Sequence, residues 1–139
     1  MTNNPASLTT QQADLVRMAI DIRRSAYAPY SNFLVGAALL ADDGRVFVGC
    51  NVENASYSLC VCAERVAGGT AVANGSRKWT TVAVASRGGV TPCGACRQWL
   101  GEFGDDLVVL CVDAETKAVT NHLLRDLLPH AFNKSSLAT

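Results

Sequence analysis

The sequence contains few charged residues, no cluster of basic residues and no long hydrophobic run. Charged residues make up 17% of its 139 residues, whereas about 25% is usual in a soluble domain. The 12 Lys and Arg balance the 12 Asp and Glu, and no three basic residues are consecutive. Proteins that bind a nucleic acid polymer usually carry a basic stripe, so the composition disfavours such a partner. No apolar stretch approaches the ~18 residues that cross a bilayer, so we expect no membrane contact.

The first twelve residues, MTNNPASLTTQQ, have neither the basic start nor the apolar stretch of a signal peptide. We therefore expect a soluble, cytoplasmic protein, in which the six cysteines serve a metal site or catalysis rather than disulfides. The length predicts a single domain over residues 1–139, with a core over about 8–132 and a polar tail over 133–139. The low charge fraction also suggests buried contacts between subunits.

The pattern of apolar residues predicts alternating helices and strands. A capping box at Thr9 and Gln12 starts a helix that should run to about Ala26. Apolar runs on either side of Asp42-Asp43-Gly44 predict a β-hairpin. The later elements are expected to be a helix over 62–74, a strand over 79–86, a helix that Pro92 opens, strands over 107–112 and 118–120, and a helix over 121–128. This order predicts an α/β fold, a three-layer α/β/α sandwich around a mixed sheet of about five strands.

Three cysteines are spaced so that they could bind one metal ion. Cys93 and Cys96 lie at the start of one predicted helix, and Cys62 opens another. A helix N-terminus has free N–H groups and a partial positive charge, which favour a thiolate over a thiol. If the two helix ends converge, they present three thiolates to zinc and leave its fourth position open for water, which is the arrangement of a catalytic zinc site.

Two residues beside Cys62 suit the same chemistry. Glu64 would lie near the water without binding the metal, where it could take a proton and deliver it to a substrate nitrogen. Arg65 could hydrogen-bond the thiolates and offset their negative charge.

Two structural interpretations of the cysteines remain open. A Cys-x-x-Cys pair is often a redox pair or half of a structural zinc site, and Cys60 could join the other three thiols in a closed four-cysteine site. A closed site would leave Glu64 without a role. Cys50 and Cys111 lie in predicted strands, where small core residues are the simplest interpretation.

The sequence Cys-Ala-Glu at 62–64, followed by Pro-Cys-x-x-Cys at 92–96, resembles the zinc-dependent nucleoside and nucleobase deaminases. Similarity to the small homotetrameric cytidine deaminases extends over roughly residues 15–132. The motifs that carry it are YSxFxVGAALL at 30–40, GCNVENA at 49–55, CAER at 62–65, PCGACRQ at 92–98 and LLPxAF at 127–132. Gly68 and Gly69 depart from the family pattern, and we expect them to allow close helix contact across a subunit interface.

The resemblance implies functional roles for residues of these motifs. Cys62, Cys93 and Cys96 would bind one Zn²⁺ per chain, and Glu64 would shuttle protons. The residues that would contact the substrate are Asn51 and Glu53 at the ribose hydroxyls, Phe33 beside the pyrimidine, and the backbone of Ala63 and Thr91 at the edges of the base. Ala55, Tyr57 and Phe132 would enter the pocket of a neighbouring subunit, where the ring of Phe132 would cover the base.

The implied reaction is the hydrolytic deamination of free cytidine and 2′-deoxycytidine to the uridine nucleosides and ammonia, in pyrimidine salvage. Zinc would activate the water that attacks C4. Two alternatives use the same zinc site: a deaminase of nucleic acids or of a nucleoside antibiotic, and a zinc-stabilised binding module without turnover. The neutral charge argues against a nucleic acid substrate, and the Asn51 and Glu53 pair favours a free ribose.

Overall fold

The computed structural model describes residues 2–3 and 7–138 and contains a six-stranded mixed sheet. The strands are β1 Thr2–Asn3, β2 Gly36–Ala41, β3 Val46–Cys50, β4 Trp79–Ser86, β5 Val108–Asp113 and β6 Val119–Leu123. Their order across the sheet is β1-β6-β5-β4-β2-β3, with β4 and β5 parallel and every other pair antiparallel. The five predicted strands are therefore present, and the two-residue β1 extends one edge. Residues 1, 4–6 and 139 of the predicted domain lie outside the described residues.

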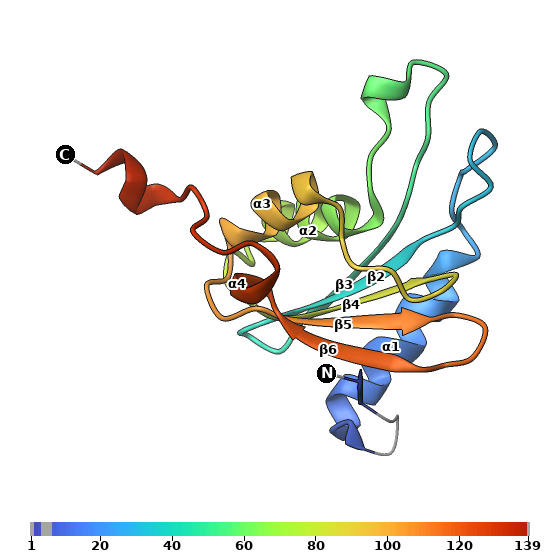
Figure 1. Cartoon of the computed structure of the whole chain (residues 1–139), viewed down its shortest axis with the longest axis horizontal. Helices are drawn as coiled ribbons and strands as arrows, with labels where there is room; N and C mark the ends of the chain where they lie inside the picture. The colour runs from blue at the N-terminus through green and yellow to red at the C-terminus, as the bar shows by residue number, and fades with distance from the viewer. Residues whose placement is uncertain (1, 4–6, 139) are drawn as a thin grey trace.

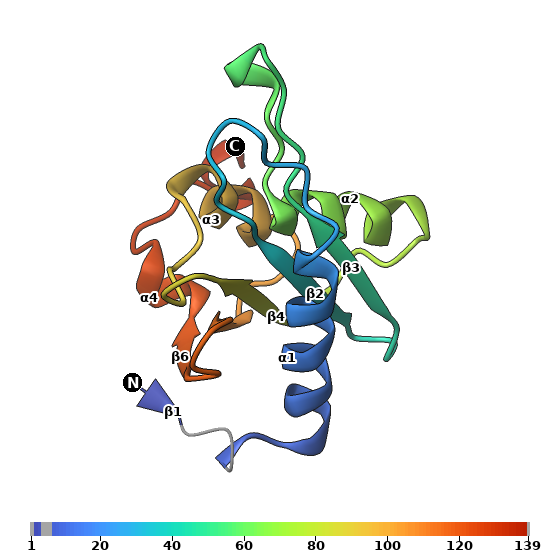
Figure 2. The ribbon, with the colours of Figure 1, turned by 90° about the vertical axis from the view of Figure 1, so that its right-hand side faces the viewer.

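Helices cover both faces of the sheet, which confirms the predicted three layers (Figures 1 and 2). The helices are α1 Thr10–Arg23, α2 Ala63–Ala73, α3 Gly94–Gly101 and α4 Leu124–Leu127. Neighbouring residues of a strand point to opposite faces, so Ala38 and Leu40 of β2 pack in the cluster with α1, whereas Ala37 and Leu39 pack in the cluster with α2, α3 and α4. The sheet is thus buried on both sides.

Three predicted boundaries were wrong. Helix α1 ends at Arg23, before Ala26, because the chain turns there and the Tyr27 N–H bonds the Asn51 carbonyl. Residues 121–123 form a strand rather than a helix, since hydrogen bonding to β5 extends β6 through them and leaves α4 with four residues. Pro92 lies outside α3, where Cys93 is the N-cap.

Glycine allows α1 and α2 to lie directly on the sheet. A Cβ atom on Gly36 would lie 2.1 Å from the Ala19 carbonyl oxygen of α1, and one on Gly49 would lie 2.4 Å from the Ala67 nitrogen of α2. Any larger residue would push the helix away. Gly49 therefore sets how closely α2, which carries Cys62 at its N-terminus, approaches the sheet.

Gly68 makes its close contact within the chain. It is buried in α2, and a Cβ atom there would lie 2.4 Å from the Trp99 ring and 2.7 Å from the Trp79 ring. Gly69 is exposed, and among the described residues a Cβ atom added to it would meet nothing within 4 Å apart from the adjacent backbone of α2 itself. For Gly68, the expected interface contact is therefore replaced by packing between α2 and α3.

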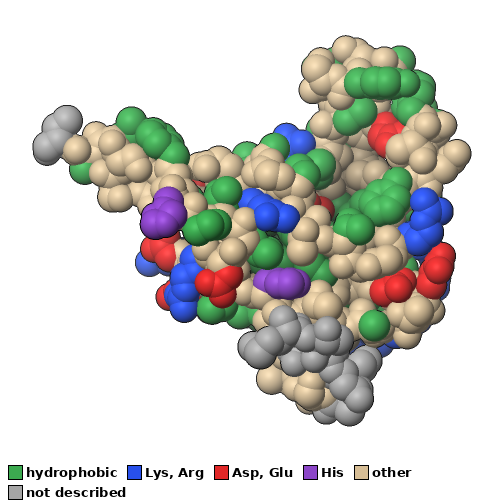
Figure 3. All heavy atoms as spheres, viewed as in Figure 1, with side chains coloured by type: hydrophobic (Ala, Val, Ile, Leu, Met, Phe, Trp, Pro, Cys, Tyr) green, Lys and Arg blue, Asp and Glu red, His purple; other side chains and the backbone are tan. Residues whose placement is uncertain are grey.

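Two segments project from the body of the molecule. One is the loop between β3 and α2, which carries a 3-10 turn at Tyr57–Leu59, and the other is the C-terminal segment (Figure 1). Apolar side chains gather on both projections (Figure 3), and Tyr57, Leu59 and Leu137 are each more than 60% exposed. Among the described residues, no helix is long and apolar enough to span a membrane.

Candidate active site

The three predicted metal ligands meet where α2 and α3 begin. Cys62 is the N-cap of α2, Cys93 is the N-cap of α3, and Cys96 follows in its first turn. All three sulfur atoms lie within 4.8 Å of one another, and the Sγ atoms of Cys62 and Cys93 are 3.9 Å apart. Two Zn–S bonds of about 2.3 Å at a tetrahedral angle separate their sulfurs by about 3.8 Å. The donor set and its spacing therefore fit one zinc ion.

The surroundings of the Cys62 sulfur favour its thiolate form. A hydrogen bond from Cys96, together with the Arg65 guanidinium, lowers the pKa of Cys62 to about 5, although burial acts in the opposite direction. Nη2 of Arg65 lies 3.5 Å from the Cys62 sulfur. Because Cys96 donates to Cys62 and is buried near Glu64, its own pKa is raised. Cys62 is thus the first of the pair to ionise, and Arg65 offsets its charge.

Glu64 lies in the first turn of α2 and is 4% exposed. Burial raises the pKa of its carboxyl, and the negative charge of Cys62 acts in the same direction, whereas a hydrogen bond with Cys96 opposes them. A carboxyl group with a raised pKa can both accept and donate a proton closer to neutral pH. Glu64 is thus a buried carboxyl group with a raised pKa that lies in the same helical turn as the N-cap Cys62.

A cavity of about 320 Å³ opens over this site. Eight predicted site residues line it: Phe33, Asn51, Glu53, Cys62, Ala63, Glu64, Thr91 and Cys93. Cys96 is buried behind them. The cavity also has an apolar wall to which the sequence analysis assigned no role, formed by Val35, Val84, Val90 and Pro92; Val35 and Pro92 belong to the family motifs, whereas Val84 and Val90 lie outside them. In the sequence, Val84 resembles any other residue of a buried strand, so no local signal separates it from the core.

The Asn51 side chain is fixed by the backbone of the segment that precedes β2. Its Oδ1 accepts a hydrogen bond from the Val35 N–H at 2.9 Å, and its Nδ2 donates to the Phe33 carbonyl at 2.9 Å. The amide keeps a second N–H, because an NH₂ group has two donors. Asn51 therefore holds the segment that carries Phe33 and still has a donor for a ligand.

Glu53 is fixed in a similar way by the loop that precedes β2. Its Oε1 accepts from the N–H groups of Tyr30 at 3.0 Å and Ser31 at 3.2 Å, and its Oε2 accepts from the Ser31 hydroxyl. The Ser31 hydroxyl contributes most to lowering the pKa of this carboxyl. Ser31 also lines the cavity, and no sequence motif had singled out its side chain as the partner of Glu53.

Cys60 lies outside the group of three sulfurs. Its Sγ accepts a hydrogen bond from the Asn54 N–H at 3.3 Å and lies 3.7 Å from the Asn54 carbonyl oxygen. Among the described residues, the potential metal ligands form a group of Cys62, Cys93 and Cys96 without Cys60. This arrangement contradicts the closed four-cysteine alternative.

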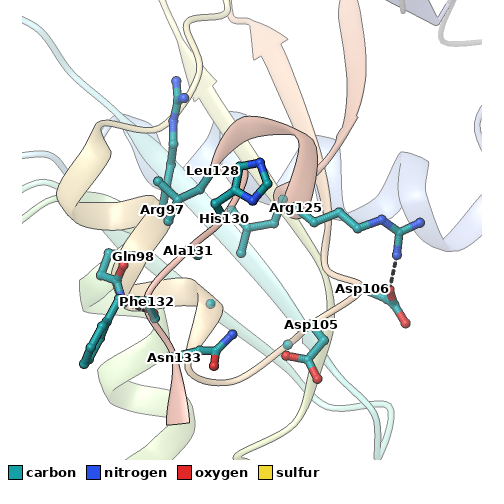
Figure 4. Close-up of a pocket in the computed structure, with 13 residues that line it drawn as sticks. Arg97, Gln98, Asp105, Asp106, Arg125, Leu128, His130, Ala131, Phe132 and Asn133 are labelled. Carbon is teal, nitrogen blue, oxygen red and sulfur yellow. Dashed lines mark hydrogen bonds and ion pairs between the residues drawn. The ribbon is translucent and has the colours of Figure 1, made fainter. Parts of the chain in front are cut away.

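The residues predicted to act in a neighbouring subunit do not line the cavity of their own chain. Ala55 and Tyr57 are exposed on the projecting loop, where the Tyr57 ring lies 5.7 Å from that of Tyr30. Phe132 is 59% exposed on the C-terminal segment. It borders a separate cavity of about 400 Å³ between α3, α4 and that segment, shown in Figure 4. None of the residues around the sulfur site lines this second cavity.

Comparison with known proteins agrees with this architecture. Residues 9–112 match the family model for the cytidine and deoxycytidylate deaminase zinc-binding region. A cytidine deaminase of Sporosarcina psychrophila is 44% identical over 118 residues, which cover 84% of this chain and 87% of that protein. One of Mycobacterium tuberculosis H37Rv is 46% identical over 114 residues, 81% of this chain and 82% of that protein.

A solved structure shares the fold. The crystal structure of a cytidine deaminase from Burkholderia pseudomallei matches with a TM-score of 0.83 and 48% identity, covering 90% of this chain and 100% of the other. The chain therefore belongs to the zinc-binding cytidine and deoxycytidylate deaminase family.

Proposed function

We propose that the chain hydrolyses free cytidine and 2′-deoxycytidine to uridine and 2′-deoxyuridine, releasing ammonia. The observation that carries this proposal is the position of Glu64, a buried carboxyl group that lines the same cavity as Cys62 and Cys93 of the three convergent thiols, together with Asn51 and Glu53. A zinc ion held by Cys62, Cys93 and Cys96, one per chain, would lower the pKa of a bound water molecule to near neutrality.

Glu64 performs both proton transfers of the reaction. It takes a proton from the attacking water and gives it to ring N3, which makes C4 more electrophilic. It then takes the remaining proton of the former water from the oxygen now bonded to C4 and delivers it to the amine, so that the C4–N bond breaks, ammonia leaves and the C4 carbonyl forms. Its raised pKa suits this exchange, because a general acid–base group works best with a pKa near the working pH.

Two backbone groups that line the cavity, those of Ala63 and Thr91, recognise the edges of the base. Ala63 is the first residue of α2, so its N–H lacks a partner within the helix and can donate to the O2 atom of the base. Among the described residues, the Thr91 carbonyl accepts no hydrogen bond, so it can accept one from the amino group. Phe33 and the apolar wall pack against the ring.

The ribose lies against the polar side of the cavity. The spare N–H of Asn51 and the remaining lone pair on the Glu53 carboxylate can each bond a hydroxyl group. Both side chains are already held by backbone groups, so little rotamer freedom is lost when the sugar binds. This pair favours a free nucleoside over a base in a polymer.

Neighbouring chains of a homotetramer complete each pocket. Ala55, Tyr57 and Phe132 project from the body of their own chain, where a second chain can cover them. Exposed apolar groups of this kind gain stability when they are buried. Light scattering should show a tetramer, and a fully active stable monomer would contradict the shared pockets.

We place the enzyme in the cytoplasm, where thiol ligands stay reduced. We also propose that a single domain, with a core over about 8–132, carries out the reaction, and that the reaction serves pyrimidine salvage.

The choice of substrate can be tested directly. We expect rapid deamination of cytidine and none of a single-stranded oligonucleotide that contains cytosine, because the chain has no basic stripe to hold a phosphate backbone. Preferential action on the oligonucleotide would contradict the nucleoside proposal.

A further inference from the structure

Arg97 of α3 makes three hydrogen bonds beneath the edge of the active site. Its Nε donates to the Pro92 carbonyl at 2.7 Å, and its Nη2 donates to the Thr91 hydroxyl at 2.8 Å. On its other side, Nη1 donates to the Leu127 carbonyl at 2.7 Å. The planar guanidinium group is well suited to several bonds of fixed direction. Arg97 therefore connects the segment of Thr91 and Pro92 to the end of α4.

These bonds leave a particular backbone group free. Arg97 binds the side chain of Thr91 and the carbonyl of Pro92, but not the carbonyl of Thr91 between them. Thr91 and Pro92 both line the cavity, and proline has no N–H to contribute. Within the described part of the chain, the Thr91 carbonyl is thus left without a donor and is available to a ligand.

The Leu127 carbonyl that accepts a hydrogen bond from Arg97 belongs to a helix that is packed into the core. Leu127 ends α4, whose Leu124 is 4% exposed in the core cluster that also contains Leu100 of α3. Figure 4 shows Arg97 and Gln98 on α3 beside the segment that carries Phe132, with Arg125 and Asp106 on the opposite side of the second cavity. The Gln98 side chain holds the Phe132 carbonyl at 2.8 Å.

We propose that Arg97 is a positioning residue that sets the direction of the Thr91 carbonyl and thereby the selectivity for an amino group at C4 of the base. This inference rests on the proposed function. Without the guanidinium group, the segment of Thr91 and Pro92 can rotate, and the carbonyl loses its alignment with the amine. A ligand with oxygen at C4, such as uridine, cannot donate a hydrogen bond there and does not depend on that alignment.

The test compares cytidine with uridine in Arg97→Met, Arg97→Lys and Thr91→Val. For Arg97→Met we expect kcat/KM for cytidine to fall by about 10- to 100-fold, while the inhibition constant of uridine changes by less than about 3-fold and zinc content stays the same. Arg97→Lys restores the charge but not the planar fork, so it should recover only part of the loss. Thr91→Val removes one of the three bonds and should shift selectivity in the same direction by a smaller factor.

Arg125→Met is the matched control, because it removes an arginine whose ion pair with Asp106 is exposed. Arg125→Met should leave kcat/KM for cytidine and the inhibition constant of uridine unchanged. If Arg97→Met weakens uridine binding by the same factor as it lowers kcat/KM for cytidine, or if it loses zinc, then Arg97 has a merely structural role and the inference is overturned. If Arg97→Met does not fold, Thr91→Val provides the test, and unchanged selectivity between cytidine and uridine in that variant would overturn the inference. Absence of cytidine turnover in the unchanged protein would overturn the proposed function itself, whereas normal selectivity in folded Arg97→Met would overturn this inference alone.

Discussion

Replacing each of the two neighbouring glycines of α2 with alanine tests how α2 and α3 pack. At Gly68 the added methyl group would lie 2.4 Å from the Trp99 ring and 2.7 Å from the Trp79 ring. Neither ring can move freely, because both pack against Phe103, with centroids 5.5 Å and 4.4 Å away. At Gly69 the same methyl group would meet nothing within 4 Å in the described part of the chain, apart from the adjacent backbone of α2.

The two substitutions should change the free energy of unfolding in opposite directions. Alanine is more favourable than glycine in a helix by about 1 kcal/mol, so Gly69→Ala should stabilise the protein by about that amount. In Gly68→Ala the same gain is set against an overpacking cost of about 1–3 kcal/mol. We expect a net loss of up to about 2 kcal/mol, and hence a difference of about 1–3 kcal/mol between the two variants.

Urea unfolding followed by tryptophan fluorescence measures this difference, at one protein concentration and in saturating zinc so that ligand binding contributes equally. Gly68→Ala should also lose zinc to a chelator faster, because Trp99 belongs to the helix that carries Cys96. A Gly68→Ala variant as stable as Gly69→Ala would refute the packing argument. A destabilised Gly69→Ala would show that another chain packs against Gly69.

Three further predictions concern the site and its surroundings. Glu64→Gln should keep one zinc per chain by metal analysis yet lose nearly all cytidine turnover, because the amide cannot carry a proton; retained turnover would exclude Glu64 as the shuttle. Cys60→Ser should keep both zinc and activity, whereas Cys62→Ser should lose zinc, and a loss in both would restore the four-cysteine alternative. The pKa of Glu53 is lowered from its ordinary value of 4.5. Its ionised form therefore stabilises the folded protein at pH values above 4.5, and this stabilisation is lost as the pH falls through the lower pKa of the folded state. Ser31→Ala should therefore lose less stability than the unchanged protein on acidification, as measured by urea midpoints, and equal losses would contradict the role of Ser31.

Local signals predicted the metal site well. Cys62 and Cys93 are helix N-caps and Cys96 lies in the first turn that follows, so spacing along the chain determines where their sulfurs lie. The position of Glu64 in the same first turn as Ala63 follows from the same geometry. The meeting of the two helix ends depends on the sheet, and the apolar runs of β2, β4 and β5 indicated that sheet correctly.

Long-range contacts were harder to predict. The short helix expected over 121–128 was lost in part to pairing with β5, because hydrogen bonds to a neighbouring strand outweighed helical periodicity. Arg97 lies in the motif PCGACRQ at 92–98, but the motif does not indicate that its side chain binds carbonyls 5 and 30 residues away in the chain. Asn51 likewise shows its contact with the Phe33 segment only after β2 and β3 have paired.

The most direct test of the proposed function mixes the purified protein with cytidine and follows the loss of ultraviolet absorbance, with zinc quantified in the same sample. We predict rapid loss of absorbance by protein that contains one zinc per chain. Zinc-loaded protein that leaves cytidine unchanged would contradict the assignment of the cavity formed by Phe33, Asn51 and Glu53 to this nucleoside.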